Sequence, residues 1–185
     1  MKKQGFTLIE LMVVIVIMGI LAAVAVPKLF GMIAKSKASE VGPAAGTYVK
    51  LQDAYASETN ALGTWAKIGY AKPGGTNFNY AEDASTLTVT CAAGKASSDK
   101  TKCDDEGDVK GVVSTSTYTE AWSASNIADL NECTKGKNWV IAATIGQNNN
   151  GSGDSKVVAG TVSYNATIAS TDCEALTPNF TAIGR

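Results

Sequence analysis

Few side chains in this sequence are of the types that perform covalent chemistry. Histidine does not occur among its 185 residues, which excludes Ser–His–Asp triads, acid–base steps on imidazole and zinc sites that use histidine. No carboxylate pair, no nucleophile beside a base and no phosphate-binding loop occurs in a setting that would support catalysis. We therefore expect no enzymatic activity and no cofactor. The 16 basic and 17 acidic residues nearly balance, which argues against nucleic-acid binding driven by global charge.

The reactive side chains that do occur are four cysteines in the polar C-terminal part of the chain: Cys91, Cys103, Cys133 and Cys173. An even number of cysteines after an export signal predicts two disulfides formed outside the cytoplasm. No two of them form a C-x-x-C pair, which argues against a structural metal. Four cysteines allow three connectivities, and their spacing leaves the choice open.

One carboxylate lies where chemistry disfavours it. The run from Phe6 to Val26 contains only Thr7 and Glu10 as polar residues. At about 1.5 Å per residue a helix of this length spans roughly 30 Å, one hydrocarbon core. Lys2 and Lys3 precede the run and favour a cytoplasmic N-terminus. A carboxylate in such a span is costly unless it is paired, so Glu10 marks a functional position.

Two other interpretations of this segment remain. Ala23-Val24-Ala25 resembles a signal-peptidase site, which would release a soluble binding domain beginning at Val26. A plain single-pass anchor would also be long enough. Neither gives Glu10 a purpose, since a disposable signal or a simple anchor gains nothing from a carboxylate.

The residues Gly5-Phe6-Thr7-Leu8-Ile9-Glu10 after a short basic leader, with Pro27 just past the apolar run, resemble the prepilin signature of type IV pilins and of type II secretion pseudopilins. The resemblance covers about the first 30 residues. It implies that a prepilin peptidase cuts between Gly5 and Phe6 and methylates the new amine of Phe6.

The resemblance and the charges together predict a role for Glu10. Cleavage after Gly5 would leave a cationic amine on Phe6, and in a bundle of such helices Glu10 of one subunit can pair with the Phe6 amine of its neighbour. Pairing would satisfy two charges that hydrocarbon disfavours and would set the axial register between subunits.

The chain is expected to divide into a leader (residues 1–5), an apolar half-helix that forms membrane anchor and fibre core (6–30), and the rest of the helix with a head domain (31–185). The helix is expected to continue to about Ser57, with an apolar face that seats a sheet; Val41, Ala45, Tyr48, Leu51 and Tyr55 recur on that face. The resemblance implies that Gly19 to Pro27 can bend or melt.

The remainder predicts an α+β pilin fold, with the helix packed on an antiparallel sheet of about four strands. The expected strands are Leu87 to Cys91, Val112 to Thr119, Trp139 to Ile145 and Val157 to Ile168. Residues 61–80 are expected to form loops or short elements anchored by Trp65, Ile68, Tyr70 and Phe78. The run 147–154 is expected to be a hairpin tip.

In such a fold the cysteines fit best as Cys91–Cys103, closing a loop, and Cys133–Cys173, tying the C-terminal segment to the sheet. The pilin resemblance favours the second bridge. The acidic turn Asp104 to Asp108 resembles part of a calcium loop but lacks its final bidentate Glu, so a solvated turn is favoured.

These observations predict a major type IV pilin that sits in the bacterial inner membrane, is processed by a prepilin peptidase, and self-associates into a surface fibre with the pilus assembly machinery. Adhesion, motility or DNA uptake would follow from the fibre. The alternative is a type II secretion pseudopilin. What the fibre binds, whether it retracts and whether it is glycosylated are not readable from the residues.

Overall fold

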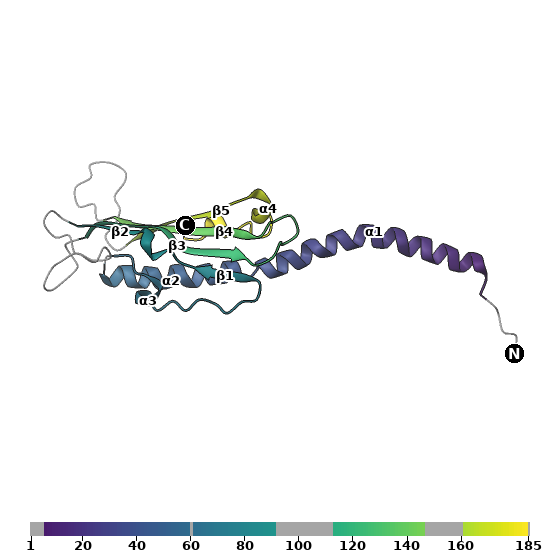
Figure 1. Cartoon of the computed structure of the whole chain (residues 1–185), viewed down its shortest axis with the longest axis horizontal. Helices are drawn as coiled ribbons and strands as arrows, with labels where there is room; N and C mark the ends of the chain where they lie inside the picture. The colour runs from purple at the N-terminus through teal and green to yellow at the C-terminus, as the bar shows by residue number, and fades with distance from the viewer. Residues whose placement is uncertain (1–5, 60, 92–112, 147–160, 185) are drawn as a thin grey trace.

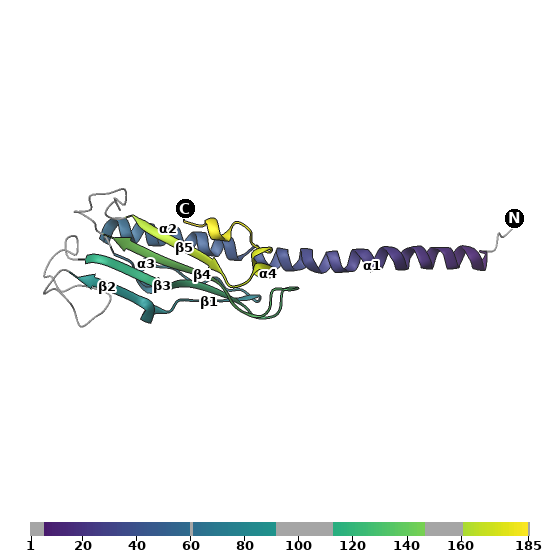
Figure 2. The ribbon, with the colours of Figure 1, turned by 90° about the horizontal axis from the view of Figure 1, so that it is seen from above.

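The computed structural model describes residues 6–59, 61–91, 113–146 and 161–184. A long helix stands out from a compact head, and its second half lies against the head's sheet (Figure 1). Helix α1 spans Leu8–Ala38 and helix α2 spans Val41–Thr59. Seen from two directions, α1 is curved in Figure 1 and nearly straight in Figure 2, so its curvature lies mainly in one plane.

The two helices are separated by a single turn at Ser39–Glu40. Pro43 explains this break, because it has no N–H to donate to the carbonyl of Ser39 and its ring crowds that carbonyl. The helix resumes at once, with the Ala44 N–H donating to Glu40 O at 3.3 Å. The expected continuation of the helix past Pro27 to about Ser57 is therefore confirmed, with one break at Ser39–Glu40.

The sheet is antiparallel throughout. Its strands are β1 (Phe78–Ala81), β2 (Leu87–Cys91), β3 (Val113–Asn126), β4 (Gly136–Gly146) and β5 (Val162–Ile168). Their order is β1-β3-β4-β5, and β2 pairs with β3 beyond the end of β1. Because β1 and β2 share one edge of the long strand β3, the sheet is four positions wide, as expected. Short helices α3 (Trp65–Ile68) and α4 (Thr171–Glu174) and the 3-10 turns η1 (Ala84–Thr86) and η3 (Phe180–Ala182) complete the head.

The core lies between α2 and the sheet. Tyr48 of α2 and Trp122 and Trp139 of the sheet are fully buried. The Trp122 Nε1–H donates to the Tyr70 hydroxyl at 3.0 Å, and that hydroxyl donates to Ala44 O at 3.2 Å. Buried aromatic rings thus pack the core, and their polar atoms connect the sheet to the backbone of α2.

Further polar contacts fix α2 on the head. The Tyr164 hydroxyl of β5 donates to Asp53 Oδ1 at 2.7 Å. The buried amide of Gln52 faces both backbone groups of Gly63; with Nε2 at 2.9 Å from Gly63 O and Oε1 at 3.0 Å from Gly63 N, both are satisfied. A Cβ at Gly63 would lie 2.8 Å from Ile68, so glycine is required there for close approach.

The expected α+β fold is confirmed, including the apolar stripe of α2 on the sheet. Residues 61–80 form loops and short elements, as expected, and the short elements are α3 and the start of β1. Strand β3 continues past Thr119 to Asn126 through a bulge between Tyr118 and Trp122. The expected hairpin tip at 147–154 lies outside the described residues.

Candidate functional site

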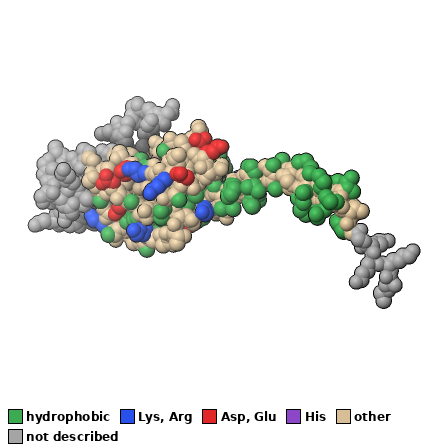
Figure 3. Space-filling model, turned by 45° about the vertical axis from the view of Figure 1, so that its right-hand side comes forward, with side chains coloured by type: hydrophobic (Ala, Val, Ile, Leu, Met, Phe, Trp, Pro, Cys, Tyr) green, Lys and Arg blue, Asp and Glu red, His purple; other side chains and the backbone are tan. Residues whose placement is uncertain are grey.

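The most unusual surface of the molecule is the free part of α1. All exposed large hydrophobic side chains of the described residues except Ile127 lie between Phe6 and Ile33. The first buried residue of the helix is Ala34. Figure 3 shows this apolar side-chain surface extending along the helix beyond the head. An exposed apolar patch of this size marks a membrane or protein contact.

The helix is long enough for either partner. The path from Leu8 to Thr59 is the one helix in the described part of the chain that is long and apolar enough to cross a membrane. The residues of α1 alone extend about 46 Å at 1.5 Å per residue. A continuous helix satisfies its own backbone hydrogen bonds, which allows it to remain in hydrocarbon without a partner.

The start of α1 places Glu10 in a capping box with Thr7. The Thr7 hydroxyl donates to Glu10 Oε2 at 2.7 Å, the Thr7 N–H donates to the same oxygen at 2.9 Å, and the Glu10 N–H donates to Thr7 Oγ1 at 3.4 Å. The carboxylate therefore has two donors within its own chain. It also lies at the positive end of the helix dipole.

Thr7 is the N-cap of α1, a role that was not predicted for it from the sequence. The signal was present in the sequence as Thr7-Leu8-Ile9-Glu10, which matches the Ser/Thr-x-x-Glu pattern of a capping box at the beginning of an apolar helix. The cost of a carboxylate in hydrocarbon indicates that Glu10 needs a partner, and the structure shows one three residues earlier in the same chain.

The expected flexible positions Gly19 and Pro27 both lie inside α1, which runs through them without a break. A Cβ at Gly19 would meet nothing within 4 Å, so space within the chain does not require glycine there. The break that the structure does show is at Ser39–Glu40. Flexibility from Gly19 to Pro27 stays a prediction.

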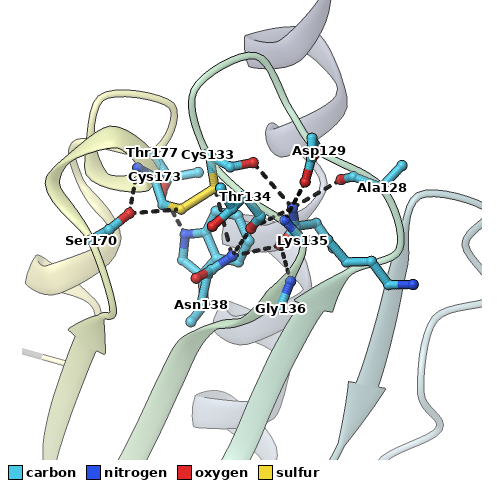
Figure 4. Close-up of a disulfide and its surroundings, with 12 residues drawn as sticks. Ala128, Asp129, Cys133, Thr134, Lys135, Gly136, Asn138, Ser170, Cys173 and Thr177 are labelled. Atoms are coloured by element: carbon cyan, nitrogen blue, oxygen red, sulfur yellow. Dashed lines mark hydrogen bonds between the residues drawn. A yellow bond between two sulfur atoms is a disulfide. The ribbon is translucent and has the colours of Figure 1, made fainter.

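At the base of the head, the Cys133–Cys173 disulfide joins the loop after β3 to α4 (Figure 4). Both cysteines are buried, so the second expected bridge is confirmed. Trp139 supports the same junction from β4, with its Nε1–H donating to Thr177 Oγ1 at 2.8 Å. The C-terminal segment is thereby tied to the sheet.

Asn126 joins the two ends of the disulfide loop by hydrogen bonds. Its Nδ2 donates to Ala128 O at 2.9 Å and to Thr134 O at 3.1 Å, while its Oδ1 accepts from Asn138 Nδ2 at 2.6 Å. Asn126 is 1% exposed. A buried side chain with these bonds holds the two ends of the loop together independently of the disulfide.

The expected bridge Cys91–Cys103 and the acidic turn Asp104 to Asp108 lie outside the described residues. In the described part of the chain, no group of three acidic or cysteine side chains is placed to hold a metal ion.

Comparisons with known proteins address the N-terminal half. A model of the prokaryotic N-terminal methylation motif matches residues 1–26. Over 80 residues the chain is 39% identical to the type IV major pilin protein PilA of Myxococcus xanthus, covering 43% of this chain and 36% of the relative. The resemblance to type IV pilins is confirmed. The pilin resemblance also extends to the type IV major fimbrial protein FimA of Dichelobacter nodosus, 56% identical over 39 residues, which cover 21% of this chain and 25% of the relative.

A further relative is the fimbrial protein EcpC of Eikenella corrodens, 54% identical over 44 residues, or 24% of this chain and 29% of the relative. The aligned stretches span well under half the length of each of these pilin and fimbrial relatives. No solved structure matches the chain.

Proposed function

We propose that this chain is a structural subunit that polymerises through α1 into a type IV pilus on the bacterial surface. The observation that carries the proposal is the exposed apolar helix from Phe6 to Ile33, which the head leaves uncovered. Side chains of this kind are stable in a bilayer before assembly and among neighbouring helices after it, since both environments keep them from water. The similarity to a type IV major pilin and to a type IV major fimbrial protein supports the same function.

Processing follows from the N-terminal motif. A prepilin peptidase cuts between Gly5 and Phe6 and methylates Phe6, which removes the leader (residues 1–5). Residues 6–30 then form the membrane anchor and later the fibre core, and 31–185 carry the head. The subunit is held in the inner membrane before assembly, and the pilus assembly machinery then incorporates it into the surface fibre. The matched methylation motif supports this sequence of events.

Glu10 sets the register between subunits. Before assembly its carboxylate is satisfied by Thr7 within the chain, which lowers the cost of holding it in hydrocarbon. In the fibre, the cationic amine of a neighbouring Phe6 is a stronger partner than a hydroxyl, because a charge-assisted bond in low dielectric exceeds a neutral one. The exchange of partners makes assembly specific for one axial offset.

The test is the intact mass of the protein in a sheared cell-surface fraction, together with the fibre yield of Glu10→Ala. A chain that begins at methylated Phe6 and is abundant in that fraction is expected. Glu10→Ala is expected to lower the fibre yield by about tenfold or more, since it leaves each Phe6 amine unpaired. Glu58→Ala, an exposed carboxylate of α2, serves as the matched control and is expected to assemble normally.

Two results would overturn the proposal. A chain that begins at Val26 would show ordinary signal cleavage, and a correctly processed chain confined to the membrane fraction would indicate the type II secretion pseudopilin. Normal fibres from Glu10→Ala would leave the pilus subunit standing and remove only the register role of Glu10.

A further inference from the structure

The junction of the two helices forms one wall of an apolar groove on the head. The cavity has a volume of about 310 Å³ and is lined by Ala38, Ser39 and Gly42 on one side and by residues 176–180 and Ile183 on the other. Figure 2 shows the C-terminal segment lying alongside the helix, with α4 next to the place where α1 leaves the head. Leu176, Phe180 and Ile183 supply large apolar side chains to the wall.

Two acidic residues lie close in sequence to this groove. Asp172 and Glu174 of α4 are exposed, and they precede the lining residue Leu176 by four and two positions. Figure 3 shows acidic side chains gathered at the end of the head nearest α1. An occupant with an apolar centre and flanking cations would therefore match both the wall and the edge of the groove.

Helix α1 contains such a segment. One face is formed by Lys28, Gly31, Met32 and Lys35, since Gly31 and Met32 lie three and four positions after Lys28 and four and three positions before Lys35. All but Gly31 are exposed. Two lysines about 10 Å apart, at a rise of 1.5 Å per residue, thus flank a glycine and a methionine. Glycine permits close approach of two backbones, and methionine adapts to an irregular hollow.

The opposite face of the same helix is already in use. Phe30, Ile33, Ala34 and Lys37 lie about half a helical turn away from the lysine–methionine face and line a hollow together with Asp129, Leu130 and Asn131 of the same chain's disulfide loop. Phe30 and Ile33 remain exposed there. The two faces therefore differ in their surroundings: one borders the disulfide loop of its own head, and the other presents the exposed side chains of Lys28, Met32 and Lys35.

We propose that the groove receives the face formed by Lys28, Gly31, Met32 and Lys35 of a second copy of this chain, with the two lysines against Asp172 and Glu174. The inference rests on the proposed fibre. Ser39 and Gly42 lie on the continuation of this face along the helix and also line the groove, so a neighbour's helix packed along α1 leads into it. The contact connects each head to a neighbour's helix and complements the register set by Glu10.

The first test is photo-crosslinking in fibres formed by otherwise unmodified chain. Benzoylphenylalanine in place of Met32 is expected to give dimers in which the probe of one copy is joined to residues 176–183 of another, and mass spectrometry locates the joined residues. The same probe in place of Ile33, on the opposite face, is the matched control and is expected not to give that product. Fibres that form without this dimer, or that crosslink Met32 elsewhere, would overturn the inference and leave the proposed function intact.

The second test exchanges charges. Lys28→Glu with Lys35→Glu, and separately Asp172→Lys with Glu174→Lys, are each expected to lower the fibre yield by about tenfold, because the reversed pairs recur at every subunit. The combination of all four is expected to recover to within about twofold of the unmodified chain. Lys72→Glu, an exposed lysine elsewhere on the head, is the control for added charge. The amount of prepilin in the membrane is measured in each case.

Normal assembly of either double variant, or no recovery in the combination, would refute the charge pairing. Absence of surface fibres from the unmodified chain would refute the proposed function itself, and the inference with it.

Discussion

Helices α1 and α2 follow one nearly continuous path, but they differ in how much of their apolar surface is exposed to water. Helix α1 has the more apolar sequence and leaves it exposed up to Ile33. Helix α2 mixes polar and apolar residues and buries seven of them, including Tyr48 and Gln52. The difference shows that α2 is folded by its own chain, whereas α1 depends on surroundings outside it, a bilayer or other copies.

The largest effect is expected from truncating one large or apolar side chain in each helix, which tests whether α2 but not α1 stabilises the head. Tyr48→Ala is expected to cost about 3–5 kcal/mol of head stability, the range for large aromatic residues in a core, because Tyr48 is 0% exposed. Val16→Ala in α1 is expected to leave head stability unchanged and to act only on assembly. Urea unfolding of the detergent-solubilised full chain measures both. An equal loss of unfolding free energy in the two variants would contradict this difference between α1 and α2.

Replacing the disulfide tests how the head is held at the junction. Cys133→Ala with Cys173→Ala opens a connection between residues separated by 40 positions, for which loop-closure entropy predicts a loss of about 4 kcal/mol. The same unfolding experiment measures it. The helical signal of the first part of α1 is expected to stay constant, since its large side chains up to Ile33 are exposed and outside the core of the head. No change in stability would show that the Asn126 hydrogen bonds hold the junction alone.

Alkaline pH is expected to lower the folding stability of the head and to leave the helix content of α1 unchanged. Burial, reinforced by the nearby carboxylate of Glu82, raises the pKa of Tyr48 and of Tyr118. Their phenols stay neutral in the folded head, while unfolded tyrosines ionise above about pH 10. Stability is therefore complete below that pH and falls above it, by up to about 1.4 kcal/mol per pH unit for each tyrosine.

Helix α1 contains no tyrosine, which makes it an internal control in the same sample. Thermal unfolding followed between about pH 9 and pH 12, with phenolate absorbance recorded alongside, tests this expectation. Tyrosines that ionise at their ordinary pKa while the head remains folded would contradict it.

The smallest expected effect is at the start of α1. Thr7→Val keeps the shape of the side chain but removes the hydroxyl that donates to Glu10, and loss of an N-cap costs about 1 kcal/mol locally. Faster hydrogen exchange in the first turn, with unchanged head unfolding, is the expected result in detergent micelles. Thr7→Ser retains the hydroxyl and is expected to behave like the original chain. Unchanged exchange in Thr7→Val would show that the capping box contributes nothing there.

Much of the structure of the head could be predicted from local patterns in the sequence. The strand Leu87–Cys91 was predicted with its observed bounds, and the anchors Trp65 and Tyr70 are buried as expected. The prediction was less successful at β1, because Phe78–Ala81 is four residues long and pairs with β3 across a long stretch of chain. A short strand of that kind carries little periodic signal.

The functional site also has a part that the sequence predicts and a part that only the structure shows. Glu10 and the apolar run stood out in the sequence, because a carboxylate in a membrane-length segment is costly wherever it occurs. The groove at the helix junction did not, since Gly42 and Ile183 lie at opposite ends of the chain and meet only through the fold.

The sequence by itself determined the long apolar helix, its methylation motif and the antiparallel strands that follow, because these depend on residue type and spacing over a few turns of helix or a single strand. The tertiary structure decided which pair of cysteines closes the base of the head, where the helix breaks, and which face of α1 remains free. Those depend on segments far apart in the chain, whose contacts are selected by packing and by burial of the whole core.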